Sequence, residues 1–139
     1  MLIVLINNTH TDPTGVPQNV MADAASSTSI TLSWQAPLAD LQNGIIRSYY
    51  ISVVELETGN IRPFMTSGVD RVLVVNLLHP FYNYNCSIAA YTIGLGPSIF
   101  VLVQTLQEGM RMQNVGIGYN TMNSIYQLRS ENPKAVFAW

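Results

Sequence analysis

The stretch that decides the fold is LLHPFYNYNCSIAAYT, from Leu77 to Thr92. From Tyr82 to Ala90 every second residue is aromatic or apolar, whereas Asn83, Asn85 and Ser87 stand between them. Side chains on a β-strand alternate between two faces, so this pattern predicts a strand with one face in a core and the other toward solvent. The protein is therefore expected to be built from half-buried strands.

The composition limits the classes of protein and of site. The chain has 139 residues, enough for about one domain that folds without metals or disulfides. Its net charge is −2 and only 10% of its residues are charged, so a nucleic-acid partner is not expected. A single cysteine, Cys86, excludes an intrachain disulfide, and with two histidines it predicts no metal site and no cofactor.

The first six residues, MLIVLI, are apolar but are followed at once by polar Asn7 and Asn8. A secretory signal needs a longer apolar run with a basic flank, and a membrane span needs about 20 residues. We therefore expect no signal peptide, no transmembrane segment and no membrane contact by this segment. Either the protein is cytoplasmic, or the chain is a piece of a larger product whose targeting signal lies elsewhere.

Turn-forming clusters divide the chain into short segments with strand periodicity. Asn43-Gly44 is the strongest of these turn signals because both residues accept positive φ. Seven strands are expected, over residues 16–24, 26–37, 45–55, 61–66, 71–77, 82–92 and 98–105. Without a helix long enough to connect parallel strands, they predict an all-β, seven-stranded antiparallel immunoglobulin-like sandwich.

One face of each predicted strand supplies the expected core, in which Trp34 should contribute most. Fully burying each large apolar side chain contributes about 1.5–3 kcal/mol, which offsets much of the ordering entropy. The expected core residues are Val20, Ile30, Leu32, Trp34, Tyr49, Ile51, Val53, Leu73, Val75, Leu78, Tyr84, Cys86, Ile88, Ala90, Val101 and Val103.

Several separated motifs, in order, resemble the fibronectin type III domain from Val16 to about Thr105. Pro17-Gln18-Asn19-Val20 is similar to the opening strand of that family, and SITLSW, residues 29–34, to its second strand with the core tryptophan. NGIIRSY, residues 43–49, followed by Ile51, resembles the third strand, and Gly94, Gly96, Pro97 and Ser98 resemble the loop before the last strand.

Leu78-His79-Pro80 together with Tyr84 resembles the tyrosine corner of the family. The resemblance implies that the Tyr84 hydroxyl bonds to backbone near Pro80. It also makes Trp34, Tyr49, Leu78, Pro80 and Tyr84 the expected structural core set. Two positions depart from the family pattern: Tyr82 replaces a common threonine, and Cys86 replaces a larger aliphatic residue.

The resemblance implies a non-catalytic protein-binding or spacer module of an extracellular multi-domain adhesion or receptor protein. The motifs SSTSITLSW and QNGIIRSYY are similar to those of receptor-type tyrosine phosphatase and adhesion-receptor ectodomains. The alternative is an accessory domain of a larger enzyme, such as a receptor phosphatase or a carbohydrate-active enzyme. The expected organisation is an irregular leader over 1–12, the domain over 13–107, and a C-terminal extension of unknown structure over 108–139.

No residue is expected to be catalytic, and the chain is not predicted to be an enzyme. His10 and His79 have no identifiable acidic partner, Glu55 and Glu57 are interpreted as a solvated strand edge, and GIGYN, residues 116–120, lacks the context of a phosphate loop. Inward-facing Cys86 is expected to act as a small hydrophobe.

Two kinds of surface site remain as candidates. Asn7 and Asn85 begin Asn-X-Ser/Thr sequences, so both are possible N-glycosylation sites if the chain passes through the secretory route. Alternation also places an apolar set on an outward sheet face, where we expect contact with an unidentified protein partner. The alternatives are that the chain's own tail or a neighbouring domain of the parent protein covers this set, which comprises Tyr50, Tyr91, Phe100 and Leu102.

Overall fold

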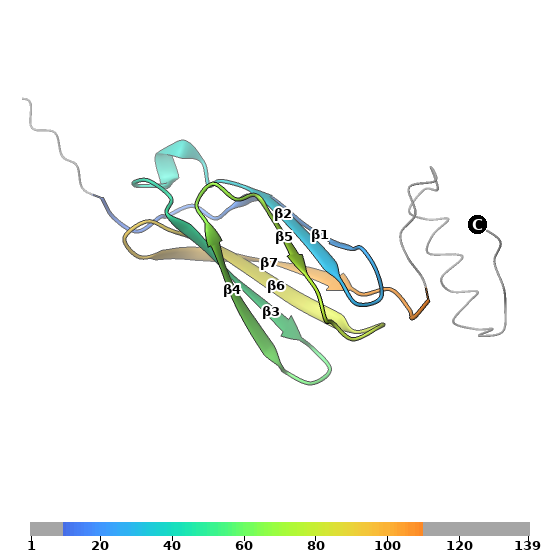
Figure 1. Cartoon of the computed structure of the whole chain (residues 1–139). Coiled ribbons are helices and arrows are strands. Elements are labelled where there is room, and N and C mark those ends of the chain that lie inside the picture. The colour runs from blue at the N-terminus through green and yellow to red at the C-terminus, as the bar shows by residue number, and fades with distance from the viewer. Residues whose placement is uncertain (1–9, 110–139) are drawn as a thin grey trace, which may run out of the picture.

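The computed structural model describes residues 10–109, which form a two-layer β-sandwich (Figure 1). One sheet has the strand order β1-β2-β5 and the other β4-β3-β6-β7. All pairings are antiparallel, which confirms the predicted fold class. The elements are β1 (Gln18–Ala24), β2 (Ile30–Gln35), the 3-10 turn η1 (Ala39–Leu41), β3 (Ser48–Glu55), β4 (Ile61–Ser67), β5 (Val72–Val75), β6 (Asn83–Tyr91) and β7 (Leu95–Gln104).

Strand β6 lies between β3 and β7, and its alternation explains the opening pattern of the sequence. Cys86 pairs with Val53 on one side and Val101 on the other, and all three face the core. The intervening Asn85 pairs with Val54 and Leu102 on the opposite face. The asparagines and serine of β6 therefore face away from the second sheet.

The core is centred on Trp34, which is 2% exposed. Its ring meets that of Tyr49 edge to face, with centroids 5.4 Å apart, a geometry that aromatic pairs favour. The Trp34 backbone N–H donates to the Arg71 carbonyl oxygen at 3.0 Å, which extends the pairing of β2 with the β5 side. Every core residue expected from the strand alternation is buried or half-buried within this cluster, whereas Pro80, expected from the resemblance, is half-buried but lies outside it.

Two details of the predicted strands were wrong. Leu95 was expected in a turn but begins β7, because the register shifts after Ala89 and lets Leu95 pair with Tyr91. Pro97 therefore lies within a strand, which is tolerated because β7 is at the edge of its sheet. Strand β5 is also shorter than expected and spans only Val72–Val75.

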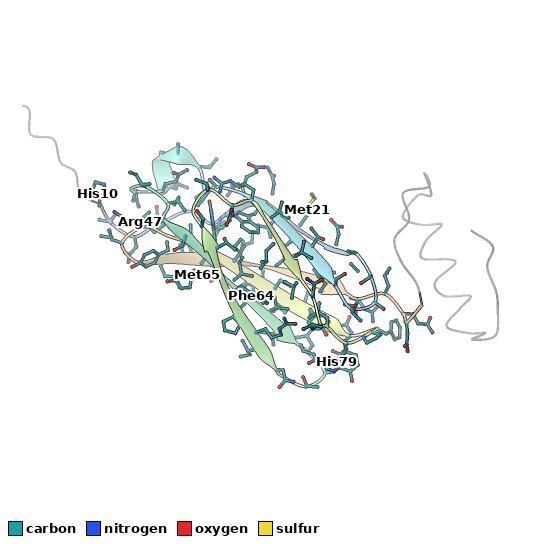
Figure 2. The ribbon with its side chains drawn as sticks, viewed as in Figure 1. His10, Met21, Arg47, Phe64, Met65 and His79 are labelled. Carbon is teal, nitrogen blue, oxygen red and sulfur yellow. The ribbon has the colours of Figure 1, made fainter. Side chains whose placement is uncertain are left out.

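The described chain enters and leaves at opposite ends of the sandwich (Figure 1). His10 lies at one end, and His79 lies at the end where residue 109 leaves (Figure 2). At the first end, the Thr11 N–H donates to the Asn43 carbonyl oxygen at 3.2 Å, and the Thr92 hydroxyl donates to the Thr11 carbonyl oxygen at 2.8 Å. The incoming segment is thus fastened to the β2–β3 and β6–β7 connections.

Between residues 10 and 109, no helix is both long and apolar enough to cross a membrane. The expectations on MLIVLI and most of the leader, on Asn7, on residues 116–120 and on most of the C-terminal extension lie outside the described residues.

Candidate interaction surface

The most distinctive surface is the outer face, by which we mean the outward-facing positions of the four-stranded sheet β4-β3-β6-β7. Alternation along each strand assigns these positions, and the burial patterns agree. They carry serine, asparagine, glutamine, alanine, proline, and apolar or aromatic side chains, and none of them is charged. The surface of a small soluble domain usually mixes charged residues of both signs, so an uncharged face is unusual for a domain that stands alone.

One end of the outer face carries a pair of tyrosines. Tyr50 on β3 pairs with Met65 on β4 and with Ala89 on β6. The rings of Tyr50 and Tyr91 are 5.5 Å apart between centroids, so they form one contiguous aromatic surface. We call Tyr50, Tyr91 and Met65 the tyrosine end.

The other end carries aliphatic and phenyl side chains on the edge strand β7, beside Asn85 of β6. Phe100 pairs with Ser87, and Leu102 pairs with Asn85. Phe100 is 65% and Leu102 69% exposed, and Met65 at the tyrosine end is 65% exposed. We call Asn85, Phe100 and Leu102 the leucine end.

The structure places all four side chains named from the sequence on this one face. Sequence reasoning missed Met65 and also Ile61, both on β4 and both largely exposed. Alternation puts Ile61 and Met65 on one side of β4, but Phe64 makes the other side apolar too, and only the pairing with β3 shows which side faces outward. Figure 2 shows Met65 on the four-stranded sheet and Met21 on the other sheet.

The tyrosine corner forms as the resemblance implied. The His79 backbone N–H donates to the Tyr84 hydroxyl oxygen at 2.9 Å. Burial raises the pKa of the Tyr84 phenol, and this bond from the backbone acts in the opposite direction. The Thr105 hydroxyl donates to the His79 carbonyl oxygen at 2.7 Å. Both backbone polar groups of His79 are therefore bonded, which holds the β5–β6 loop at this residue.

The interpretation of Glu55 as solvated was wrong. Glu55 ends β3 on the inner face, in phase with Tyr49, Ile51 and Val53, and is only 5% exposed. Its Oε1 lies 2.6 Å from Nδ1 of His79, which therefore does have an acidic partner, and its Oε2 accepts from the Thr58 hydroxyl at 2.9 Å. Buried polar groups are normally hydrogen-bonded, and this carboxylate is satisfied by residues of two loops.

Glu57 also has a structural role, although it is exposed as expected. Its carboxylate accepts from the Asn83 backbone N–H at 3.0 and 3.1 Å and from the Asn83 side-chain amide at 2.8 Å. The backbone bond holds the pKa of the Glu57 carboxyl below its usual range. Both acidic residues therefore brace the end of the sandwich that carries His79.

A cavity of about 290 Å³ adjoins the Glu55–His79 pair. Its polar lining is already engaged: the Tyr84 hydroxyl holds the corner, and Arg62 Nη1 donates to the Asn76 carbonyl oxygen at 2.6 Å. No serine, threonine or cysteine lines it, and the one hydroxyl bonded to the pair, that of Thr58, donates its proton to the Glu55 carboxylate instead of facing the cavity. This arrangement fits a brace better than a catalytic centre.

The remaining candidates for chemistry are structural. Burial raises the pKa of the Cys86 thiol to about 11, which keeps it protonated and unreactive. Cys86 borders a gap in the core, together with Trp34 and Val101, that has no room for a water molecule. Among residues 10–109, no three histidine, cysteine or acidic side chains gather as a metal site would require.

The Glu55 brace predicts a loss of stability in acid. Burial acts to raise the Glu55 pKa, but the bonds from Thr58 and His79 outweigh it, and the pKa is lowered. A group with a depressed folded pKa stabilises the fold above its unfolded pKa of about 4.3, and that contribution disappears as the pH falls through the folded value. We expect Glu55→Gln to reduce the free energy of unfolding at pH 7 by about 1 kcal/mol and to flatten its dependence on pH below 4.5.

Urea unfolding followed by circular dichroism between pH 3 and 7 measures this effect. Asp23→Asn is the matched control, because Asp23 is exposed on β1 and the same charge is removed. If the free energy of unfolding falls in parallel for wild type and Glu55→Gln as the pH is lowered, the brace does not contribute to the loss of stability in acid.

Comparison with known proteins identifies relatives of this sandwich. Residues 15–101 match the family model of the fibronectin type III domain. The cell adhesion molecule DSCAM of Gallus gallus is 38% identical over 102 residues, which are 69% of this chain and 5% of that protein. Receptor-type tyrosine-protein phosphatase F of Mus musculus is 30% identical over 95 residues, 64% of this chain and 5% of that protein.

Solved structures also resemble this sandwich. The crystal structure of the FN5 domain of Drosophila Lar is 32% identical, with a TM-score of 0.55, and the match covers 68% of this chain and 97% of that one. The FN1-FN3 domains of chicken CNTN1 share the fold at 21% identity, with a TM-score of 0.60 over 68% of this chain and 33% of that one. The chain spans only a small part of the length of the curated relatives it matches.

Proposed function

The chain belongs to the fibronectin type III family, and on this basis we propose that it is a non-catalytic spacer and protein-binding module in the extracellular part of a multi-domain adhesion or receptor protein. The outer face is the observation that carries the proposal. It presents exposed aromatic and apolar side chains among uncharged polar ones and carries no charged residue over four strands, and exposed apolar groups of this kind are typical of a surface that contacts protein.

The geometry of the two ends supports the spacer role. Because the described chain enters and leaves at opposite ends of the sandwich, similar domains joined to it would follow one another in a row (Figure 1). The bonds that fasten Thr11 would limit swinging of a preceding domain. At the other end, the Leu106 N–H donates to the Ser26 carbonyl oxygen at 3.2 Å, which supports a C-terminal domain bound near residue 107.

The names of the relatives support the adhesion or receptor setting. DSCAM is a cell adhesion molecule, and the matched phosphatase is of receptor type. The second candidate function, an accessory domain of a larger enzyme, is favoured by the 30% identity to receptor-type tyrosine-protein phosphatase F. Both proposals give this domain the same non-catalytic role, and a catalytic motif in the full reading frame would favour the second.

The binding role is tested by changing both ends of the outer face together. We expect Tyr50→Ser with Phe100→Ser to weaken binding to a partner ectodomain about tenfold or more, because truncated aromatic anchors typically cost over 1 kcal/mol each. Surface plasmon resonance of the chain against a panel of purified adhesion-receptor ectodomains measures the effect. The control is Val72→Ser with Val74→Ser, two exposed apolar residues on the other sheet.

Two outcomes would overturn the binding role. In one, no ectodomain binds and the chain does not self-associate. In the other, binding is equally sensitive to the control pair, which would place the contact on the three-stranded sheet instead.

A further inference from the structure

The sequence Asn85-Cys86-Ser87 occupies the middle of β6, the strand enclosed by β3 and β7. Residues two apart on a strand share a face, so Asn85 and Ser87 both point outward while Cys86 faces the core. Both residues that define an N-glycosylation acceptor therefore lie on the outer face.

The Asn85 side chain has no structural role that its neighbours explain. Its Oδ1 is buried and has no hydrogen-bond partner, whereas its Nδ2 is not among the buried unpaired atoms. An unsatisfied buried acceptor costs about 1–3 kcal/mol, so an amide is a poor choice here on packing grounds alone. The Nδ2 atom is the one that carries an N-linked sugar.

Asn85 is surrounded by apolar side chains, some of which are exposed to solvent. Val54 and Leu102 flank it in the same row across the sheet, and Phe100 belongs to the next row. Phe100 and Leu102 are mostly exposed, and no outward position of the strands is charged; the carboxylate of Glu57, bonded to Asn83, lies beside this end and leaves Phe100 and Leu102 uncovered. A glycan is bulky and solubilising, and it would supply what charged residues supply on other sheets.

We propose that Asn85 carries an N-linked glycan that covers Leu102 in its own row and leaves Phe100 and the tyrosine end open to a protein partner. In the transfer, the Asn85 amide nitrogen bonds to the anomeric carbon of a polyprenyl-diphosphate-linked oligosaccharide. The bond from that carbon to the phosphate oxygen breaks, the polyprenyl diphosphate leaves, and the amide loses one proton. The proposal rests on the extracellular role proposed above, because only the secretory route supplies this donor.

The fold fixes when the transfer must happen. The backbone of β6 around Asn85 pairs with β3 on one side and β7 on the other, so a folded sheet cannot present the acceptor as a free extended strand. Because β7 follows β6 in the chain, the acceptor is accessible during synthesis, before the sheet closes over it. Glycan addition therefore precedes folding, and the already folded chain is not an acceptor.

The site is tested in the full chain, secreted from eukaryotic cells behind an added signal peptide. Asn7→Gln removes the other acceptor sequence, so any glycan on this background reports on Asn85. We expect intact-mass analysis to show one added N-glycan, its loss on further Ser87→Ala, and its retention on Ser87→Thr. Both changes at Ser87 leave Asn85 and the core intact. Secreted Asn7→Gln protein without glycan mass would overturn the proposal.

The covering role is tested by sedimentation of the same proteins over a range of concentrations. We expect the Asn7→Gln, Ser87→Ala protein to self-associate where the glycosylated Asn7→Gln protein stays monomeric, and we expect an added Leu102→Ser to restore the monomer. If the proteins with and without the glycan self-associate to the same degree, the covering role is wrong. Secretion is imposed in these experiments, so their failure concerns Asn85. Failure of the proposed extracellular role would instead appear as no surface biotinylation of the parent protein in its own cells.

Discussion

Replacing Trp34 with alanine is expected to reduce the free energy of unfolding by about 3–5 kcal/mol, the usual cost of emptying a buried aromatic site. Trp34 is the largest of the fully buried side chains and forms the edge-to-face pair with Tyr49. Domains of this size are stable by about 5–15 kcal/mol, so the variant should be partly unfolded at moderate temperature. Urea unfolding followed by far-ultraviolet circular dichroism measures the change.

Two further variants show whether volume or hydrogen bonding is responsible. The Trp34 Nε1 atom is buried without a hydrogen-bond partner, so Trp34→Phe loses ring volume but no bond and should cost much less than Trp34→Ala. Thr31→Ala, on the outward side of β2, should stay within about 1 kcal/mol of wild type. If Trp34→Ala unfolds at the wild-type urea concentration, the core is not organised around this indole.

The strands and the core were predictable because each depends on local alternation. Trp34 and Tyr84 fall on the inward side of strands with an unbroken period of two, and no distant contact is needed to place them. The same rule places Tyr50 and Phe100 outward. The contiguity of the outer face then follows from the strand order, which the family resemblance implied.

The polar braces were not predictable in the same way, because they depend on contacts between loops. Alternation does place Glu55 inward, but an acidic residue at a strand end is usually solvated. Its carboxylate is bonded by Thr58, three residues along the chain, and by His79, 24 residues away, and the second contact has no local signal in the sequence. The early start of β7 at Leu95 was missed for a related reason, since the shift in register after Ala89 has no local signal in the sequence.

Gly68→Ala is the second change expected to have a large effect, about 2–4 kcal/mol of lost stability. Gly68 is buried in the β4–β5 connection, and its N–H donates to the Arg47 carbonyl oxygen at 2.9 Å. A Cβ at this position would overlap the Ile46 carbonyl group, which is backbone and cannot rotate away as a side chain could. To make room for it, the β4–β5 connection would have to move away from residues 46 and 47, which lead into β3. This movement would break the hydrogen bond from the Gly68 N–H to the Arg47 carbonyl oxygen.

Gly59→Ala is the matched control, and it separates two reasons for a glycine. Gly59 has a φ of 77°, in the left-handed region, but nothing lies within 4 Å of an added Cβ, so alanine should cost only about 1 kcal/mol there. Backbone conformation alone would rank the two variants in the opposite order, because Gly59 has a positive φ and Gly68 does not. Thermal unfolding in which Gly59→Ala is the more damaging change would therefore refute the close approach of the β4–β5 connection to Ile46.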